Sequence, residues 1–320
     1  MKQEEKKTLQ IPYEECTDGS IIWRYSKNPI IGRNPNETIA RAFNSAVVEF
    51  NSKFVGIFRG DTKSTIPYLY YGESEDGINF KINKDPIVFY NIDGSKHEIE
   101  YAYDPRVVKI DDTFYIMWCN GSNGAPTIGL AETKDFKKYT FISSPFLPFN
   151  RNGVLFPKKI NGEFAMLSRP SDGGHTPFGD IFISYSKDLV YWGKHQLVMK
   201  PSWQWWQSTK IGAGPFPIET KEGWILIYHG VTKTCAGMVY SIGAALLDLN
   251  DPSKVIGRTD NYLMTPEMEY ETVGFVPNVV FPCAALVDDK GRIAIYYGAA
   301  DTYLSLAFTT VDKLLSVLKK

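Results

Sequence analysis

The chain has 320 residues, of which 43% are hydrophobic and 22% charged, and its 35 basic and 36 acidic side chains give a formal net charge of −1. This balance excludes a disordered chain, an acidic tail protein and a generic polyanion binder. No apolar run approaches the ~20 residues that span a bilayer, and the charged start MKQEEKKTLQ is unlike a signal peptide. We therefore expect a soluble, cytoplasmic protein that binds no membrane.

Short runs of β-branched and aromatic residues, separated by Gly, Asn, Asp and Pro, predict an all-β fold. Five runs share one layout, in which a strand, a tight polar turn and an aromatic-rich strand follow one another. In chain order they are AVVEFNSKFVGIFR from Ala46, RVVKIDDTFYIMWC from Arg106, VLFPKKINGEFAMLSR from Val154, GPFPIETKEGWILIYHG from Gly214 and VFPCAALVDDKGRIAIYYG from Val280. Their turns contain the polar and glycine residues that β-hairpins require.

The five runs begin 48 to 66 residues apart, which gives each unit room for four strands. A further strand pair follows three of them, in YLYYGESEDGINFK, TIGLAETKDFKKYT and DIFISYSKDLVYWG. Four strands repeated five times predict a five-bladed β-propeller with a central active-site pocket, whereas a β-sandwich would not explain a repeat of this length. We expect residues 1–320 to form this single domain, with a short N-terminal arm and a C-terminal helix in DKLLSVLKK.

The innermost strand of each propeller blade lines the central channel, so residues just before it, or at the end of the next strand, should converge there. Polar residues recur at both places. They are Asn44, Ser45, Tyr103, Asp104, Arg151 and Lys210 before the inner strands, and Arg59, Asp61, Arg169, His229 and Asp301 at or near the ends of the second strands. His175, in SDGGHTPFGD, is a further candidate imidazole.

Arg151, Arg169 and Lys210 would place three cations at one axis without matching acids beside them. Cations held together repel one another, and a phosphate would satisfy all three, because Arg offers a forked pair of donors and Lys a point charge. The alternative is that each cation pairs locally on a solvated rim.

Asp104 is the best candidate acid, because it lies between Tyr103 and Pro105 at the channel end of an otherwise apolar strand, where the protonated carboxyl would be favoured. An Asp before a Pro is as often only a turn residue, and the pattern leaves both interpretations open. Asp61 and Asp301 could each hold sugar hydroxyls or cap a loop.

The cluster WQWW, with Trp203, Trp205 and Trp206, has two interpretations as well. It could form a wall that stacks a sugar, or it could pack between blades.

Cleavage of a glycoside with inversion needs an acid and a base that holds water, but no base is needed where phosphate attacks instead. One acid beside a cationic pocket is therefore the minimal set for an inverting phosphorylase. The sequence contains no metal-binding cluster, no CxxC pair and no Gly-rich nucleotide loop after a strand. We expect no metal, no cofactor beyond inorganic phosphate as co-substrate, and no nucleic acid partner.

Long motifs carry a family resemblance. FNSAVV, YAYDPRVV, PFNRNGVLFPKKINGEFAMLSRPSDGGHTPFGDI, KIGAGPFPIET, GWILIYHGV and GRIAIYYGAADT resemble the β-mannoside phosphorylases of glycoside hydrolase family 130, and the likeness runs from about Trp23 to Phe308. The resemblance implies reversible, inverting conversion of phosphate and a β-1,4-mannoside into α-mannose 1-phosphate and a shortened acceptor. It also implies a five-bladed propeller, in agreement with the repeat count, and a homo-oligomer.

The resemblance further implies roles for single residues. Asp104 of the YDPR motif would be the general acid, acting through a sugar hydroxyl. The phosphate site would consist of Arg151, Arg169, Lys210 and His229. The substrate site would consist of Asn44, Ser45, Arg59 and Asp301, to which we add Tyr103 and His175. The family pattern has Asp directly after the Arg59 position, whereas this chain reads Arg59-Gly60-Asp61, so the role of Asp61 stays open.

The sequence leaves three alternatives for the function open. The acceptor could be N-acetylglucosamine or glucose rather than mannose. The chain could be a β-mannoside hydrolase, although the hydrolase branch lacks the three basic residues that this chain keeps. It could also be a propeller that binds carbohydrate or protein without catalysis, since a fold alone does not fix function.

Overall fold

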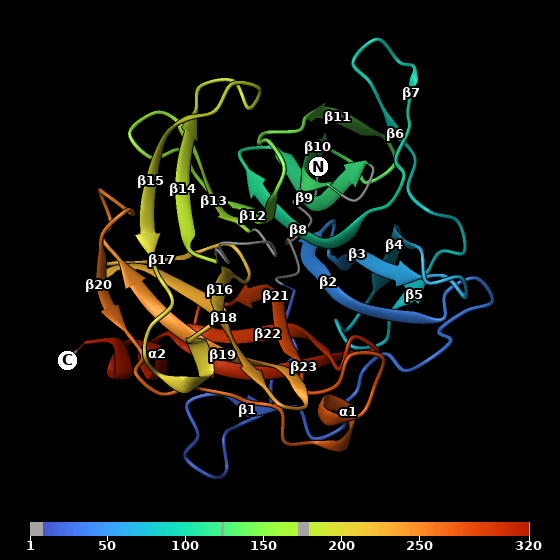
Figure 1. Cartoon of the computed structure of the whole chain (residues 1–320). Helices are drawn as coiled ribbons and strands as arrows, with labels where there is room; N and C mark the ends of the chain where they lie inside the picture. Colours follow the sequence, from blue (N-terminus) through green and yellow to red (C-terminus); the bar gives the residue numbers. More distant parts are fainter. Residues whose placement is uncertain (1–8, 123–124, 172–178, 320) are drawn as a thin grey trace, which may run out of the picture.

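The computed structural model describes residues 9–122, 125–171 and 179–319. In this part of the chain the sheets form five blades arranged around a common centre (Figure 1). This architecture confirms the predicted all-β, five-bladed propeller. His175 lies outside the described residues, so its predicted site role stays untested.

The first two blades contain the sequence repeats at Ala46 and Arg106. Blade 1 has the order β2-β3-β4-β5, and blade 2 has the order β8-β9-β10-β11 followed by β6 and β7. Their bounds are β2 Arg41–Phe50, β3 Lys53–Asp61, β4 Pro67–Ser74, β5 Lys81–Ile82, β6 Phe89–Tyr90, β7 Lys96–His97, β8 Tyr103–Ile110, β9 Thr113–Ser122, β10 Ala125–Thr133 and β11 Tyr139–Ser143.

The third and fourth blades contain the repeats at Val154 and Gly214. Blade 3 has the order β12-β13-β14-β15, and blade 4 has the order β16-β18-β19-β20, with β17 also paired to β18. Their bounds are β12 Asn150–Leu155, β13 Phe164–Pro170, β14 Ile181–Ser186, β15 Gly193–Met199, η1 Trp205–Gln207, β16 Lys210–Ala213, β17 Ile218–Thr220, β18 Gly223–Thr234, β19 Gly237–Leu247 and β20 Val255–Arg258.

The fifth blade joins the two ends of the described chain. It has the order β21-β22-β23-β1, so the N-terminal strand β1 completes the sheet that the C-terminal repeat begins. Trp23 and Arg24 of β1 pair antiparallel with Phe308 and Ala307. The bounds are β1 Trp23–Arg24, α1 Glu269–Thr272, β21 Val280–Val287, β22 Arg292–Ala299, β23 Tyr303–Thr310 and α2 Val311–Leu318. The predicted C-terminal helix is thus present as α2.

Short turns set the hairpin registers. Asn51 and Ser52 both have positive φ (49° and 60°) between the paired residues Phe50 and Lys53. Two left-handed residues in a two-residue loop match the right-handed twist of the flanking strands. Asn161 and Gly162 repeat this conformation in blade 3, as the polar turns of the sequence predicted.

Apolar packing lies between the blades and not at the centre of the ring. Five buried clusters join neighbouring sheets, and each draws side chains from two adjacent blades. Between blades 1 and 2, for example, Val48 and Ile57 pack with Val107 and Trp118. Because each sheet buries both of its faces against its neighbours, the large apolar clusters lie away from the axis, where polar side chains occur together with a few apolar ones such as Phe281.

The packing interpretation of WQWW holds for one of its three tryptophans. Trp206 is buried against Tyr228, and its ring nitrogen donates to the Asp260 carbonyl. Trp203 is 90% exposed and Trp205 is 53% exposed. One tryptophan therefore packs inside blade 4, and two face solvent.

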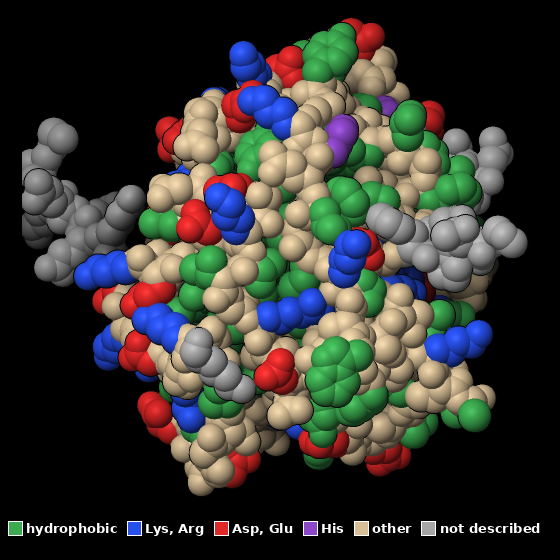
Figure 2. All heavy atoms as spheres, turned by 60° about the vertical axis from the view of Figure 1, so that its left-hand side comes forward, with side chains coloured by type: hydrophobic (Ala, Val, Ile, Leu, Met, Phe, Trp, Pro, Cys, Tyr) green, Lys and Arg blue, Asp and Glu red, His purple; other side chains and the backbone are tan. Residues whose placement is uncertain are grey.

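Charged side chains of both signs are interspersed over the face shown in Figure 2, in keeping with the net charge of −1.

No helix in the described part of the chain is long and apolar enough to cross a membrane.

A buried ion pair supports closure of the ring. Arg24 of β1 donates from Nε and Nη2 to the two carboxylate oxygens of Glu271, at 2.7 and 2.8 Å. The Glu271 side chain is fully buried and also accepts from Tyr297 Oη and the Glu267 backbone N–H. Although burial opposes charge, the hydrogen bonds and charge of Glu271 raise the pKa of Arg24.

Replacing Glu271 tests this closure. Glu271→Ala leaves the largely buried Arg24 guanidinium with only the exposed Glu267 carboxylate and should lower the free energy of unfolding by about 3 kcal/mol in denaturant titrations. Glu269→Ala, on the exposed side of the same short helix, should change it by less than about 0.5 kcal/mol. Equal stability of the two variants would show that the ion pair does not support the ring.

Candidate active site

Three inner strands enter the axis through the same backbone irregularity. Pairing shifts by one residue between Phe43 and Ala46 in β2, between Tyr103 and Arg106 in β8 and between Arg151 and Val154 in β12. Each shift is a β-bulge, which turns the strand and re-aims its side chains. These residues were predicted to precede the inner strands; they lie inside them, because the bulge lets pairing continue beyond the extra residue.

Each of the three bulges contains a left-handed residue. Asn44, Asp104 and Asn152 have φ of 42°, 52° and 55°. Asn and Asp enter this region more readily than other non-glycine residues. The recurrence in three blades indicates that the strained backbone is used to present side chains at the centre, as strained residues often do at functional sites.

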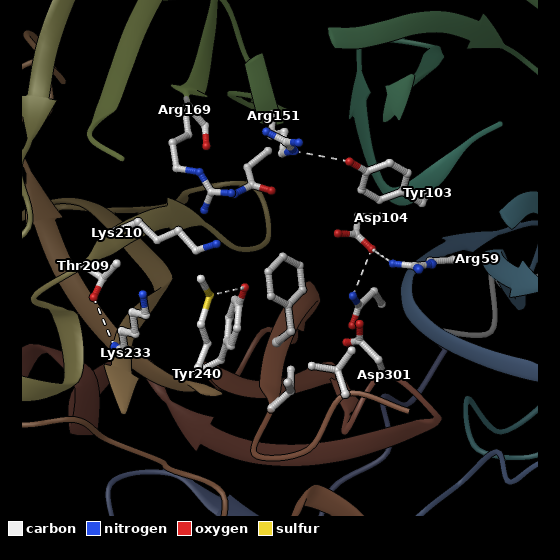
Figure 3. A pocket seen from close by; sticks show the side chains of 17 residues that line it. Arg59, Tyr103, Asp104, Arg151, Arg169, Thr209, Lys210, Lys233, Tyr240 and Asp301 are labelled. Atoms are coloured by element: carbon white, nitrogen blue, oxygen red, sulfur yellow. Dashed lines mark hydrogen bonds and ion pairs between the residues drawn. The ribbon is translucent and has the colours of Figure 1, made fainter. Parts of the chain in front are cut away.

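A pocket of about 650 Å³ lies at the centre of the ring. Its lining includes eight of the predicted site residues: Asn44, Arg59, Tyr103, Asp104, Arg151, Arg169, Lys210 and Asp301. Figure 3 shows the charged ones pointing into one cavity from different blades. The predicted convergence at a central pocket is therefore found for these eight.

Asp104 lies in a network of polar contacts on one side of the pocket. Its Oδ1 accepts from Arg59 Nη1 at 2.8 Å and from Asn44 Nδ2 at 2.9 Å. The apolar setting expected from the sequence is therefore replaced by two hydrogen-bond donors. The Asp104 side chain nevertheless lines the pocket, so Asp104 is more than a turn residue.

Arg59 holds two carboxylates in place. It donates from Nε to Asp61 Oδ1 at 3.0 Å as well as to Asp104, and its guanidinium lies over the Phe43 ring. Burial opposes its charge, but the carboxylates of Asp104, Asp61 and Asp301 raise the pKa of Arg59. Asp61 itself is buried and also pairs with Arg41 at 3.2 Å. It is therefore a buried counter-ion shared by Arg41 and Arg59.

Asp301 faces the same side of the pocket from the turn between β22 and β23. Burial raises its pKa to about 6, and the neighbouring Asp104 and Asp61 charges add to this rise while Arg59 opposes it. Near neutral pH the pocket therefore contains one carboxyl that takes up a proton readily, next to Asp104.

Cations occupy the other side of the pocket, on blades 3 and 4. Among the residues that the structure describes, no carboxylate lies within ion-pair distance of Arg151, Arg169 or Lys210. Arg151 Nε donates to Tyr103 Oη at 3.3 Å, and Lys210 Nζ lies over the Tyr240 ring. Burial, with the charges of Arg169 and Arg151, lowers the pKa of Lys210 to about 8.

His229 lies behind Arg169 and not in the pocket lining. It lies within the long strand β18, five residues before the end of that strand. Its side chain is fully buried. Burial and the charges of Arg169, Arg106 and Lys210 hold its pKa well below the ordinary range. Neutral Nε2 then accepts from Arg169 Nη1 at 3.1 Å. Its position supports the orientation of Arg169.

Ser45 is also outside the lining. It is buried, and its hydroxyl donates to the Phe43 carbonyl while accepting from the Arg59 backbone N–H. It therefore fixes the β2–β3 bulge from behind the pocket.

Sequence reasoning missed several lining residues. Tyr240, Phe281 and Asn152 line the pocket, together with Lys233 and Met238 from the end of the β18–β19 hairpin. Asn152 was visible in the FNRNG motif, at the position that matches Asn44 and Asp104. Tyr240 had no such signal, because it lies on the third strand of its blade and reaches the axis only through the length of that hairpin.

Arg106, which is buried behind the pocket lining, connects the two sides of the pocket. It is 1% exposed and donates to the carbonyls of Gly214 at 2.6 Å and Asp104 at 2.9 Å. One buried guanidinium thus links blade 2 to blade 4 and holds the left-handed residue whose side chain enters the pocket. No cluster of metal-ligating side chains occurs among the described residues.

A family model described as β-1,4-mannooligosaccharide phosphorylase matches residues 4–320. The β-1,4-mannooligosaccharide phosphorylase of Ruminococcus albus is 54% identical, over 97% of this chain and 95% of its own length. A 1,2-β-oligomannan phosphorylase of Thermoanaerobacter sp. is 36% identical, over 89% and 95%. Among solved structures, the β-1,2-mannobiose phosphorylase of Listeria innocua with bound β-1,2-mannobiose superposes with a TM-score of 0.83, at 28% identity over 93% of this chain and 99% of that one.

The close packing of Asn44 provides a test of the site's geometry. A Cβ at Gly298 would lie 1.7 Å from Asn44 Oδ1 and 2.8 Å from its backbone nitrogen. Gly298→Ala should displace the Asn44 amide from Asp104 and lower the free energy of unfolding by about 1–3 kcal/mol. Gly32→Ala, where no atom lies within 4 Å, is the control and should be neutral. Denaturant titration measures both, and a neutral Gly298→Ala would show that the bulge can adjust freely.

Proposed function

The chain belongs to the β-1,4-mannooligosaccharide phosphorylase family, glycoside hydrolase family 130, and we propose that it cleaves β-1,4-mannosides with phosphate, releasing α-mannose 1-phosphate. The observation that carries the proposal is the division of the pocket, with Arg151, Arg169 and Lys210 on one side and Asp104, Arg59 and Asp301 on the other. The 54% identity to the Ruminococcus albus enzyme supports the β-1,4 linkage.

The cationic side suits a phosphate dianion. Three buried or half-buried cations without a carboxylate among the described residues repel one another, and an anion between them removes that repulsion. Two guanidinium groups and one ammonium supply the donors that phosphate oxygens accept. Tyr240, which lies beside Lys210, is placed to add a hydroxyl to the same anion.

The carboxylate side suits the mannosyl unit. Asp104, Asp301, Asn44 and Arg59 present donors and acceptors at fixed positions for sugar hydroxyls. Phosphate attacks C1 from the cationic side, and the glycosidic bond breaks on the opposite face, so the configuration is inverted. Asp104 is the proposed acid that delivers a proton to the leaving oxygen through a sugar hydroxyl.

The expected location and assembly are part of the proposal. We propose that the enzyme works in the cytoplasm, where a charged sugar phosphate is retained because it does not cross a bilayer unaided. We also propose a homo-oligomer, supported by exposed apolar side chains such as Leu147 and Phe149 in the connection between β11 and β12. Measurement of the particle mass by light scattering or sedimentation tests this assembly.

Product analysis tests the reaction. With β-1,4-mannobiose and phosphate, the enzyme should release α-mannose 1-phosphate and mannose, and omission of phosphate should abolish turnover. Asp104→Asn, which can still accept from Asn44 and Arg59, should stay folded and lose at least about 100-fold in kcat. Phosphate-independent release of mannose would instead identify a hydrolase, and sugar binding without any product would identify a binding protein.

The lowered pKa of Lys210 predicts a pH dependence. The ammonium carries its charge below its pKa of about 8 and loses it above that value. The KM for phosphate should therefore rise as the pH increases beyond about 8. Lys210→Arg keeps a charge at all these pH values, so the rise should move to higher pH or vanish.

Lys221→Arg, in an exposed turn of blade 4, is the matched control for the same measurement and should keep the wild-type profile. A profile that is unchanged in Lys210→Arg would remove Lys210 as its cause.

A further inference from the structure

A second cleft opens next to the central pocket. It has a volume of about 480 Å³ and shares Arg59 and Tyr103 with the central pocket. Its other walls come from Tyr101, which precedes β8, from Ile66 in the turn between β3 and β4, and from Phe275, which precedes β21. Nothing in the proposed cleavage step uses these three side chains.

Aromatic rings in the cleft are held in place and remain accessible. Tyr101 stacks on Tyr103 with ring centroids 5.9 Å apart and an interplanar angle of 26°. Phe275 is 54% exposed, and its ring lies 3.8 Å from the Arg41 guanidinium carbon. Because Arg41 in turn pairs with Asp61, the exposed ring is fixed from beneath. Rigid, exposed aromatic faces bind the apolar faces of ligands with little loss of entropy.

Polar groups complete the lining. The carboxylate residues Asp61 and Glu100 and the Arg59 guanidinium are in the same wall as the rings. Aromatic faces beside carboxylates and guanidinium groups match the surface of a pyranose ring, which has apolar C–H faces and hydroxyls around its edge. The chemistry of the cleft thus suits a neutral sugar more than an anion.

The stereochemistry of the proposed reaction gives the direction in which the acceptor leaves. In an inverting displacement the nucleophile and the leaving group lie on opposite faces of the sugar. Phosphate would be on the side of Arg169 and Lys210, and Figure 3 shows Arg59 across the pocket from them. The leaving sugar must therefore depart toward Arg59 and Tyr103, which are the two residues that the cleft shares.

We propose that this cleft binds the reducing-end units of a β-1,4-mannooligosaccharide beyond the first acceptor sugar, with Tyr101 and Phe275 as its stacking residues. The inference rests on the proposed function. It assigns chain-length preference to this cleft and not to Trp203 and Trp205, which are exposed between blades 3 and 4 and line neither cavity.

Chain-length kinetics test the assignment. kcat/KM is measured with phosphate and β-1,4-linked mannobiose, mannotriose and mannotetraose. Tyr101→Ala and Phe275→Ala should lower kcat/KM for the trimer and tetramer by about three- to ten-fold, mainly through KM, and should change the value for mannobiose by less than two-fold. Tyr101→Phe keeps the ring and should behave as the wild type. Trp203→Ala, the aromatic control, should leave all three values unchanged.

Several results would overturn the assignment. They are a wild type that uses mannotriose no better than mannobiose, an equal loss at all three lengths in Tyr101→Ala, or a length-dependent loss in Trp203→Ala. Calorimetry in the Asp104→Asn background separates this inference from the proposed reaction. If the wild type makes no mannose 1-phosphate but Tyr101→Ala still loses the extra affinity for mannotriose, the reaction is refuted and the cleft is supported. Thermal unfolding of each variant identifies loss of fold.

Discussion

The mutual repulsion of three cations at the propeller axis is the constraint on which the site depends. Arg151, Arg169 and Lys210 are brought together by blades 3 and 4, and no described carboxylate lies within ion-pair distance of them. Such an arrangement is unfavourable by itself, because each charge is partly desolvated next to like charges. It persists because the apolar clusters between the blades fix the strands that carry the cations. An anion bound between the cations would reduce their repulsion.

On the opposite side of the pocket, cations and carboxylates lie next to one another. Arg59 is surrounded by Asp61, Asp104 and Asp301. Burial, together with the charges of Asp104 and Asp61, raises the pKa of Asp301. The two sides differ because they come from different blades, and Arg106 spans them through backbone carbonyls without adding a carboxylate to the cationic side.

Much of this arrangement follows from sequence, and the exceptions have physical causes. Repeat length and hairpin turns predicted five blades, and the position of polar residues in each repeat predicted eight lining residues. The pattern could not show that bulges place Asn44, Asp104 and Asn152 within strands, since a one-residue slip in pairing leaves no compositional trace. It placed His229 at the end of the second strand, whereas β18 continues for five more residues. It also could not foresee Tyr240, whose approach depends on the length of a hairpin. Family motifs named residues but not their distances.

Closure of the ring connects the stability of the fold to the geometry of the pocket. Asp301 lies in blade 5 and Asp104 in blade 2, and blade 1 stands between them with Asn44 and Arg59. Blade 5 is complete only when the N-terminal strand β1 pairs with β23, and Arg24 with Glu271 holds that strand in place. A looser β1 would let blades 5 and 1 separate, and the carboxylate side would lose its shape before the cationic side did. The contacts that close the ring therefore support the geometry of the pocket at its centre.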